Sequence, residues 1–256
     1  MAATVVGADA FTSTGTQSTT NVPLPAHLAG DILFILVVLN VTTPTGFITE
    51  PLNWHALAAE PATSNATTRA FWARAVSDNQ FGAAVTVTHS TFRRTSAASI
   101  VVRGGHAVND PYGGPEGTSG TMVTAAEVNP IAAADTLLVA LIGYRTGGRT
   151  WPITDADWTE DDAADGGSTN TGARAGHRTS LIPAGAFTQE TLWVDGSGNN
   201  GNCWTLAVES APVAPPAGAT MKVYTGSDFV EGISKVWDGD EWLEGVMKVY
   251  DGAEFI

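Results

Sequence analysis

The chain has few of the residues on which several functional classes depend. One of its 256 residues is cysteine, Cys203, which excludes an internal disulfide and is typical of synthesis in a reducing cytoplasm. Lys and Arg number 12 against 26 Asp and Glu, so the formal net charge is −14. Nucleic acids and anionic membrane surfaces both attract Lys and Arg, and this balance therefore argues against either as a partner.

Long apolar runs are also absent. The longest candidate, Ile32–Leu39, is too short to cross a membrane as a helix, so no membrane insertion is expected. A continuous apolar run of this length is typical of a strand that is covered on both faces.

Residues 1–211 have the pattern of strands almost throughout. β-branched or alternating segments are separated by Gly, Pro, Asn and Asp, and no segment has a convincing helical period with caps. The sequence therefore predicts an all-β body of the β-sandwich or jelly-roll type. The expected strands are Ile32–Leu39, Thr68–Val76, Ala83–Thr88, Thr95–Val102, Thr136–Tyr144, Gln189–Val194 and Trp204–Val208.

The usual signatures of catalysis and metal binding are missing. There is no Gly-x-Ser-x-Gly segment, and the histidines form no His-x-His or His-Glu-x-x-His pair. Positions in loops or turns explain the histidines better than a zinc site does, and Cys203 is expected to be a buried, inert thiol. We therefore expect no enzyme activity, no catalytic residue, no cofactor and no metal.

Two polar segments are rich in oxygen-bearing side chains of the kind that bind metal ions. The acidic run Asp155–Asp162 lacks the spacing of an EF-hand and fits a solvated loop or the end of a strand better. The Gly- and Asn-rich segment Asp195–Gly201 fits the connection of a hairpin better.

The body shows signs of an internal duplication with an offset of 104 residues. Asp31 and Asp135 each precede an apolar strand, and the offset also relates Trp54 to Trp158 and Arg74 to Arg178. This predicts two similar β units, of about residues 1–105 and 106–211, in which each Trp fills its half of a shared core.

The C-terminus contains one short phrase three times. Lys222, Lys235 and Lys248 are 13 residues apart, and each is followed by Val, an aromatic residue, a polar residue and Gly, and then an acid, an aromatic and an aliphatic residue. Each copy predicts a strand, a turn and a second strand. Since a hairpin of this size is marginal alone in water, the copies must pack on each other or on a partner.

Basic-residue usage marks the boundary of these repeats. All nine arginines precede them and all three lysines lie within them. The Pro- and Ala-rich segment between them is typical of a semi-rigid spacer. We therefore predict a body over residues 1–211, a linker over 212–219 and three 13-residue hairpin repeats over 220–256.

The candidate interaction residues are aromatic. Alternation of aromatic and acidic residues predicts hairpins with one aromatic and one charged face, so we expect the aromatic side chains to mediate assembly, or to stack within the chain. These residues are Tyr224, Phe229, Trp237, Trp242, Tyr250 and Phe255. Trp151, which follows a Gly-rich loop, is the candidate for a contact with a glycan.

The repeated phrase K-V-[YW]-[DT]-G-x-[DE]-[FW] resembles C-terminal repeats on minor tail proteins and other virion proteins of tailed bacteriophages of actinobacteria, of the siphophage type. The body pattern, in which Gly30-Asp31-Ile32-Leu33 is followed by a Trp-containing segment and by R-A-F-W-A-R-A, is similar to β-sandwich domains of the same class. The resemblance implies a structural virion protein that is synthesised in the host cytoplasm and forms a homo-oligomer, for example a trimer. It also implies contacts with other virion proteins and with host-surface glycans.

Three functions follow as expectations. The first is a minor tail or tail-tip protein that assembles through its aromatic hairpins. The second is a capsid decoration or head-fibre protein. The third, from another class, is a carbohydrate-binding module or a glycan-active enzyme, for which Trp151→Ala should abolish sugar binding.

Overall fold

The structure is a computed structural model of the chain, and the part that it describes consists of strands, turns and short connections without a helix. The described residues are 2–13, 15–41, 48–57, 66–109, 116–125, 128–131, 135–145, 153–165, 171–183, 185–187, 190–210, 221–224, 229–232, 235–237 and 242–244. The chain forms two compact units, Met1–Pro212 and Val213–Ile256, which we call the body and the C-terminal unit. The expectation of an all-β, sandwich-like fold is confirmed.

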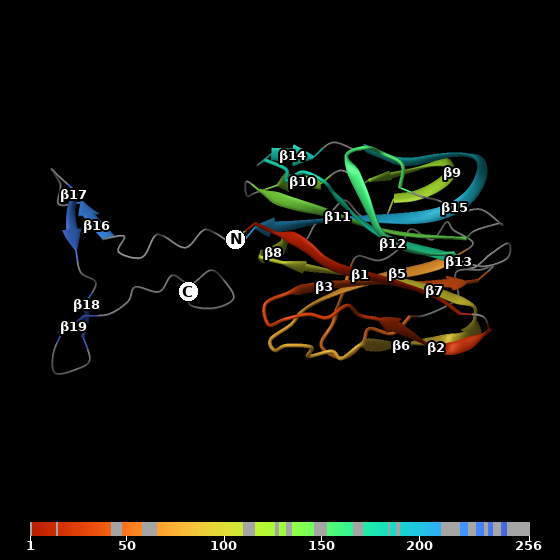
Figure 1. The fold of residues 1–256 in the computed structure, drawn as a ribbon, viewed down its shortest axis with the longest axis horizontal. Coiled ribbons are helices and arrows are strands. Elements are labelled where there is room, and N and C mark those ends of the chain that lie inside the picture. Colours follow the sequence, from red (N-terminus) through yellow and green to blue (C-terminus); the bar gives the residue numbers. More distant parts are fainter. Residues whose placement is uncertain are drawn as a thin grey trace. The chain divides into compact units, whose positions relative to one another are not determined.

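Two antiparallel sheets face each other in the middle of the body (Figure 1). The first sheet has the strand order β1 (Thr4–Thr12), β7 (Thr95–Arg103), β3 (Ile32–Asn40), β5 (Ala66–Arg74) and β4 (His55–Ala56). The second sheet has the order β8 (Gly105–Asn109), β15 (Glu190–Ser210), β11 (Thr136–Arg145), β13 (Thr171–Arg178) and β12 (Trp158–Asp165), and β9 (Glu116–Ala125) also pairs with β15. Each sheet thus comes from one half of the body, and we call residues 2–104 the first half and 105–210 the second half.

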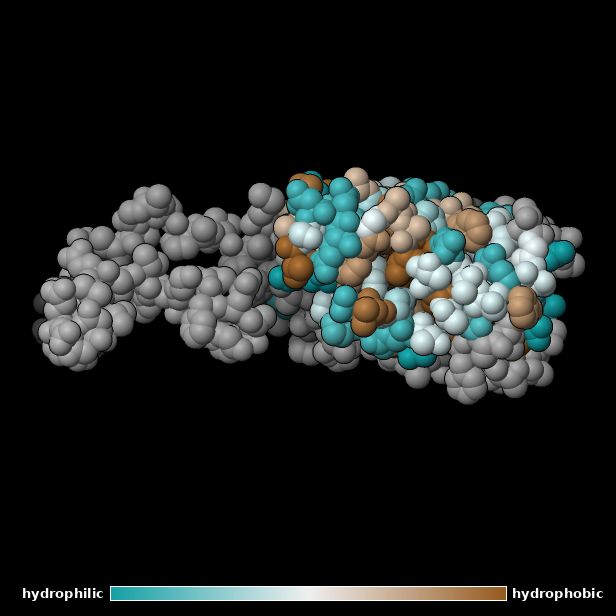
Figure 2. Space-filling view, turned by 90° about the horizontal axis from the view of Figure 1, so that it is seen from below, coloured by the Kyte–Doolittle hydropathy of each residue, from teal (hydrophilic) through white to brown (hydrophobic). Residues whose placement is uncertain are grey.

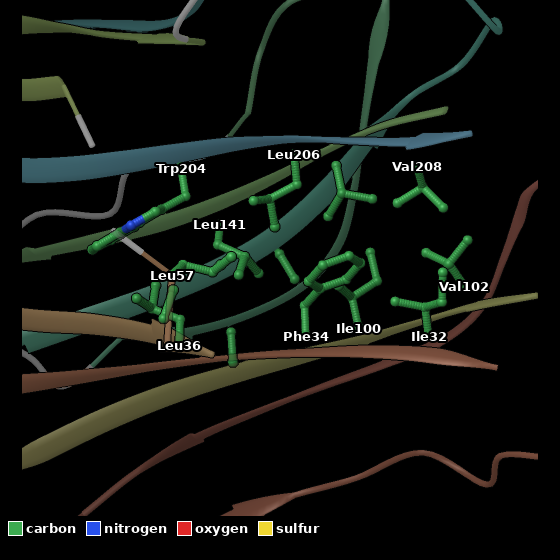
Figure 3. Close-up of a cluster of buried hydrophobic side chains, with 14 of the residues drawn as sticks. Ile32, Phe34, Leu36, Leu57, Ile100, Val102, Leu141, Trp204, Leu206 and Val208 are labelled. Carbon is green, nitrogen blue, oxygen red and sulfur yellow. The ribbon is translucent and has the colours of Figure 1, made fainter. Parts of the chain in front are cut away.

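The central core lies between these two sheets. Phe34, Leu36 and Ile100 of the first sheet pack against Leu141 and Trp204 of the second, and all five side chains are fully or almost fully buried (Figure 3). The residues of β3 between these positions point the other way, and they are equally buried. Every residue of Ile32–Leu39 is inaccessible to solvent, as the continuous apolar run predicts.

Shorter strand pairs cover the outer faces of both sheets (Figure 1). In the first half, β2 (Gln17–Pro23) pairs with β6 (Ala84–Arg93), and Val22 and Val87 pack on the outer side of β3. In the second half, β10 (Val128–Ile131) pairs with β14 (Gly185–Phe187), while the first part of β15 pairs with β9. Each half is therefore a small sandwich, and the two sandwiches pack through their larger sheets.

Pairing registers relate the two halves by an offset of 105 residues in the central strands. Leu36 pairs with Ala70, and Leu141 pairs with Ala175, and all four side chains face the central core. Gly30 with φ of 89° and Asp135 with φ of 60° are both left-handed and have the same offset, and they lie two residues before β3 and one residue before β11. The predicted 104 is one residue too short for the strands, and a slip of one residue turns every side chain to the opposite face. Asp31 and Asp135 are therefore not equivalent residues.

Trp54 and Trp158, in contrast, do occupy equivalent places. Each closes a turn through its backbone N–H, which donates to the oxygen of Pro51 or of Asp155, at 3.1 and 3.2 Å. The two indoles are 2% and 5% exposed, so their prediction as core residues is confirmed. They do not share one core, however, because Trp54 lies in the outer cluster of the first half and Trp158 in that of the second.

The Gly- and Asn-rich segment Asp195–Gly201 is part of one long strand, and the prediction of a hairpin connection there is wrong. β15 runs unbroken over 21 residues and curls from the outer layer into the second sheet (Figure 1). Its register against β9 shifts between Val194 and Asn199. Gly-rich sequence therefore marks irregular pairing within a strand here and does not end the strand.

Candidate functional site

The described part of the C-terminal unit contains two hairpins of the same design. In the first hairpin, β16 (Met221–Tyr224) pairs with β17 (Phe229–Gly232), and in the second, β18 (Lys235–Trp237) pairs with β19 (Trp242–Glu244). Tyr224 is opposite Phe229 in the first hairpin, and Trp237 is opposite Trp242 in the second. The register is identical after a shift of 13 residues, which is the spacing of the repeated phrase.

The register changes the expectation for the two hairpin faces. Positions two apart along a strand share a face, as do positions that are paired across it. The Lys222–Glu231 pair therefore shares a face with Tyr224 and Phe229, while the Val223–Val230 pair occupies the opposite face. The expectation of one aromatic and one charged face is wrong, because aromatic and charged positions share a face and the other face is aliphatic. The Val236–Leu243 pair repeats this in the second hairpin.

Three of the candidate interaction residues do not belong to the part of the chain that the structure describes. Tyr250 and Phe255 of the third copy, and Trp151, lie outside the described residues. The structure thus brings the candidate aromatic positions together in pairs within each of two hairpins.

In the body, a polar cluster surrounds Arg174 on the outer side of β13. Its guanidinium is 3% exposed and contacts Glu160 Oε2 at 2.6 Å and Asp165 Oδ2 at 2.8 Å. The Arg174 Nε donates to the Tyr144 hydroxyl oxygen at 3.0 Å, and the Tyr144 hydroxyl donates to Asp165. Two carboxylates from the edge strand β12 therefore neutralise one arginine of its neighbour.

This cluster has the chemistry of a structural anchor. Burial of Tyr144, together with its hydrogen bond to Asp165, raises the pKa of its hydroxyl far above that of a free phenol, so the hydroxyl stays protonated. The ring lies directly on Gly172, where a Cβ atom would come within 2.3 Å of the ring. Sequence reasoning missed the cluster, because it depends on the register of β11, β12 and β13.

Two further acids of the run contact basic side chains of β13. His177 Nδ1 contacts Asp161 Oδ2 at 2.8 Å, and Arg178 contacts Asp157 Oδ2 at 3.4 Å. The run enters strand β12 after a turn, as its interpretation as a loop or strand end predicts. Within the described ranges, no three His, Cys, Asp or Glu side chains are grouped as a metal ion would require.

Asp31 forms a second anchor at the start of β3. Its carboxylate is 1% exposed, receives two hydrogen bonds from Arg103 at 2.9 and 2.7 Å, and accepts the backbone N–H of Leu28 at 2.8 Å. Burial by itself would raise the pKa of Asp31, but the hydrogen bonds from Arg103 and Leu28 outweigh it and lower the pKa below the ordinary value.

Four of the five histidines lie in strands, so the expectation of loop or turn positions holds only for His27. His27 is fully buried, with Nδ1 2.9 Å from the Pro25 oxygen, while the Phe81 N–H donates to Nε2 at 3.3 Å. His89 in β6 is also buried, with Nε2 3.3 Å from the Thr20 hydroxyl. The other three histidines in strands are His55 in β4, His106 in β8 and His177 in β13. Cys203, the single cysteine of the sequence, is buried, as predicted.

Exposed apolar side chains are scattered over the body. Leu52 is 87% exposed, Val76 78% and Phe92 68%. On the face of the body shown in Figure 2, apolar areas alternate with polar ones. Single exposed apolar residues are ordinary on protein surfaces and do not by themselves mark a binding site.

No protein family, characterised protein or solved structure was found to be similar to the chain. Among the residues that the structure places, there is no helix long and apolar enough to cross a membrane.

Proposed function

We propose that this chain is a structural component of the virion of a tailed bacteriophage, and more specifically a minor tail or tail-tip protein. In this proposal the body is a rigid sandwich, and the C-terminal hairpins attach it to neighbouring virion proteins or to further copies of the chain. The observation that carries the proposal is the repetition of one hairpin register after 13 residues in a unit separate from the body.

The hairpins are too small to be stable by themselves. The first is built from four-residue strands and the second from three-residue strands. An isolated two-stranded hairpin is at best marginally stable in water. Because the register places apolar positions on both faces, a hairpin of this design is suited to being covered on both sides. These features support a role in which the repeats fold against other protein surfaces.

Repetition supports attachment through several weak contacts. When similar binding units are linked in one chain, binding of the first raises the effective concentration of the next, and the overall affinity can exceed that of one unit by orders of magnitude. Three copies of the repeated phrase would allow firm attachment with little buried area in each copy. The resemblance of the phrase to repeats of phage virion proteins supports a virion as the assembly in this proposal.

The proposal is tested by deleting residues 217–256 and asking whether the body enters virions. We expect the truncated chain to be folded, with unchanged thermal unfolding of the body, and to be absent from purified particles. Fractionation of isolated tails and heads places the full-length chain, and its recovery with heads would favour a capsid decoration or head-fibre protein. A truncated body that still enters virions at the normal level would contradict the proposal.

A paired set of substitutions separates the two hairpin faces. Trp237→Ala with Trp242→Ala removes the aromatic pair of the second hairpin, and Val236→Ala with Leu243→Ala removes the aliphatic pair. We expect both changes to reduce incorporation into virions. If neither changes it, the second hairpin does not contribute to attachment.

A further inference from the structure

Two equivalent residues of the duplicated body face each other across the central core, and they differ greatly in size. The 105-residue offset relates Val38 of β3 to Gly143 of β11. A Cβ atom on Gly143 would lie 2.8 Å from Val38 Cγ2 and 2.9 Å from Thr68 Cγ2. The side chain of Val38 therefore fills the space that the missing side chain of Gly143 leaves.

Pairing of like halves would lose this fit. Two copies of the first half in the same arrangement would bring Val38 against Val38, and no space is left there for a second side chain. Two copies of the second half would bring Gly143 against Gly143 and leave a cavity. Overpacking and cavities both destabilise a close-packed core.

We propose that the inner faces of the two halves are complementary to each other and not to themselves, with Val38 as the knob and Gly143 as the hole. Each inner face therefore packs against an inner face of the other type. The two halves of one chain meet this requirement, and two copies of the chain can associate through these faces only by exchanging halves, so that a first half again packs against a second half. This inference concerns the body alone and is independent of the proposed virion role.

Polar contacts next to the Val38–Gly143 contact connect the same pair of faces. The Asn202 amide donates to the Thr68 hydroxyl at 2.5 Å, and the Ser96 hydroxyl donates to the Thr171 backbone oxygen at 2.7 Å. The first joins β5 to β15, and the second joins β7 to β13, which are the equivalent strands in exchanged halves. Because an asparagine amide donates in the first contact and a serine hydroxyl donates in the second, these contacts also distinguish the two faces.

Single substitutions in the full-length chain imitate the two like pairings. Gly143→Val imitates a first-half pair, and Val38→Gly imitates a second-half pair. We expect each to lower the thermal unfolding midpoint on the order of 5 to 10 °C. The double variant Val38→Gly with Gly143→Val restores a knob and a hole in exchanged positions. We expect it to recover at least half of the summed loss, measured by calorimetry.

Val37 provides the matched control, because it neighbours Val38 in β3 but is buried on the outer face. Val37→Gly combined with Gly143→Val should give the sum of the two single losses.

If Gly143→Val does not fold, recovery of soluble protein in the double variant Val38→Gly with Gly143→Val supports the proposal. The smaller pair Val38→Ala and Gly143→Ala then provides the quantitative cycle. Additive losses for Val38 and Gly143 would overturn the proposal.

Discussion

Arg69 and Arg174 occupy the same position in the two halves of the body, and their surroundings differ. Arg69 pairs with Val37 and Arg174 with Ile142, which places both at the same register of equivalent strands. Arg69 donates to the Ile48 backbone oxygen at 2.7 Å and lies over the Phe71 ring. Arg174 instead binds two carboxylates and a tyrosine hydroxyl.

The difference follows from the strands at the sheet edges. In the first half the edge next to β5 is β4, a strand of two residues, whereas in the second half it is the eight-residue, acid-rich β12. Charged residues and bulges are common on edge strands because they discourage pairing with other chains. The register of β12 against β13 shifts between Glu160 and Asp162. The long, acid-rich edge strand of the second half thus coincides with a buried arginine on its neighbour, whereas the short edge strand β4 contains no acid for Arg69 to bind.

The largest expected effect tests this difference directly. Arg174→Met should lower the free energy of unfolding by about 3–5 kcal/mol, because it leaves Glu160, Asp165 and Tyr144 without their shared partner. Arg69→Met at the equivalent position should cost only about 1–2 kcal/mol, since it removes one hydrogen bond and one ring contact. Urea unfolding of the two variants measures both values. Equal losses would show that the ionic cluster adds nothing to the second half.

The entries to the two central strands offer a second comparison. Asp31, directly before β3, corresponds to Thr136, the first residue of β11. The start of β3 is stabilised by the ion pair between Asp31 and Arg103. The start of β11 is held by two backbone hydrogen bonds between Thr136 and Ile182, of 3.0 and 2.7 Å. Since the folded pKa of Asp31 is lowered, the ionised carboxylate stabilises the fold above the pKa of the unfolded chain. This contribution is lost as the pH falls through the folded pKa.

Asp31→Asn should therefore destabilise the protein by about 1–3 kcal/mol at pH 7, and the difference from the wild type should shrink as the pH falls below about 4. Thr136→Ser is the matched control, because its backbone bonds persist and its side chain does not titrate in this range. Unfolding free energies measured from pH 7 to pH 3 test the prediction. A constant deficit across that range would mean that the charge of Asp31 is not what stabilises the entry to β3.

Composition and the pattern of apolar residues were sufficient to predict the strands at the centre of the fold. The run that forms β3 is visible in the sequence because a strand covered on both faces needs apolar residues at successive positions. The strands β7 and β11 were predicted from their alternating or β-branched residues. The 13-residue phrase likewise predicted hairpins, and two of them are formed in the described part of the C-terminal unit.

Features that depend on register were not predictable in the same way. Acids of β12 contact Arg174 and His177 on the next strand, and no local pattern specifies which acid meets which base. The register also decides which residues share a face in each hairpin, and whether the two halves are offset by 105 or by 104 residues. A single residue of slip reverses every side chain, and one sequence with short matches does not fix the alignment to that precision.

The smallest expected effect concerns the place where the edge strands of the two halves meet. Burial, and next the carboxylate of Asp162 in β12, raise the pKa of Asp9 in β1. Since the folded pKa is raised, stability is lost as the pH rises through it, which is the reverse of the behaviour of Asp31. Asp9→Asn should therefore stabilise the protein at pH 7, by less than about 1 kcal/mol because the group is only partly buried. This gain should disappear at acid pH, where Asp9 is protonated.

Asp162→Asn removes the same repulsion, so the two substitutions together should raise the thermal unfolding midpoint by less than the sum of the two single gains. A loss of stability in Asp9→Asn at pH 7 would mean that the two edges attract each other.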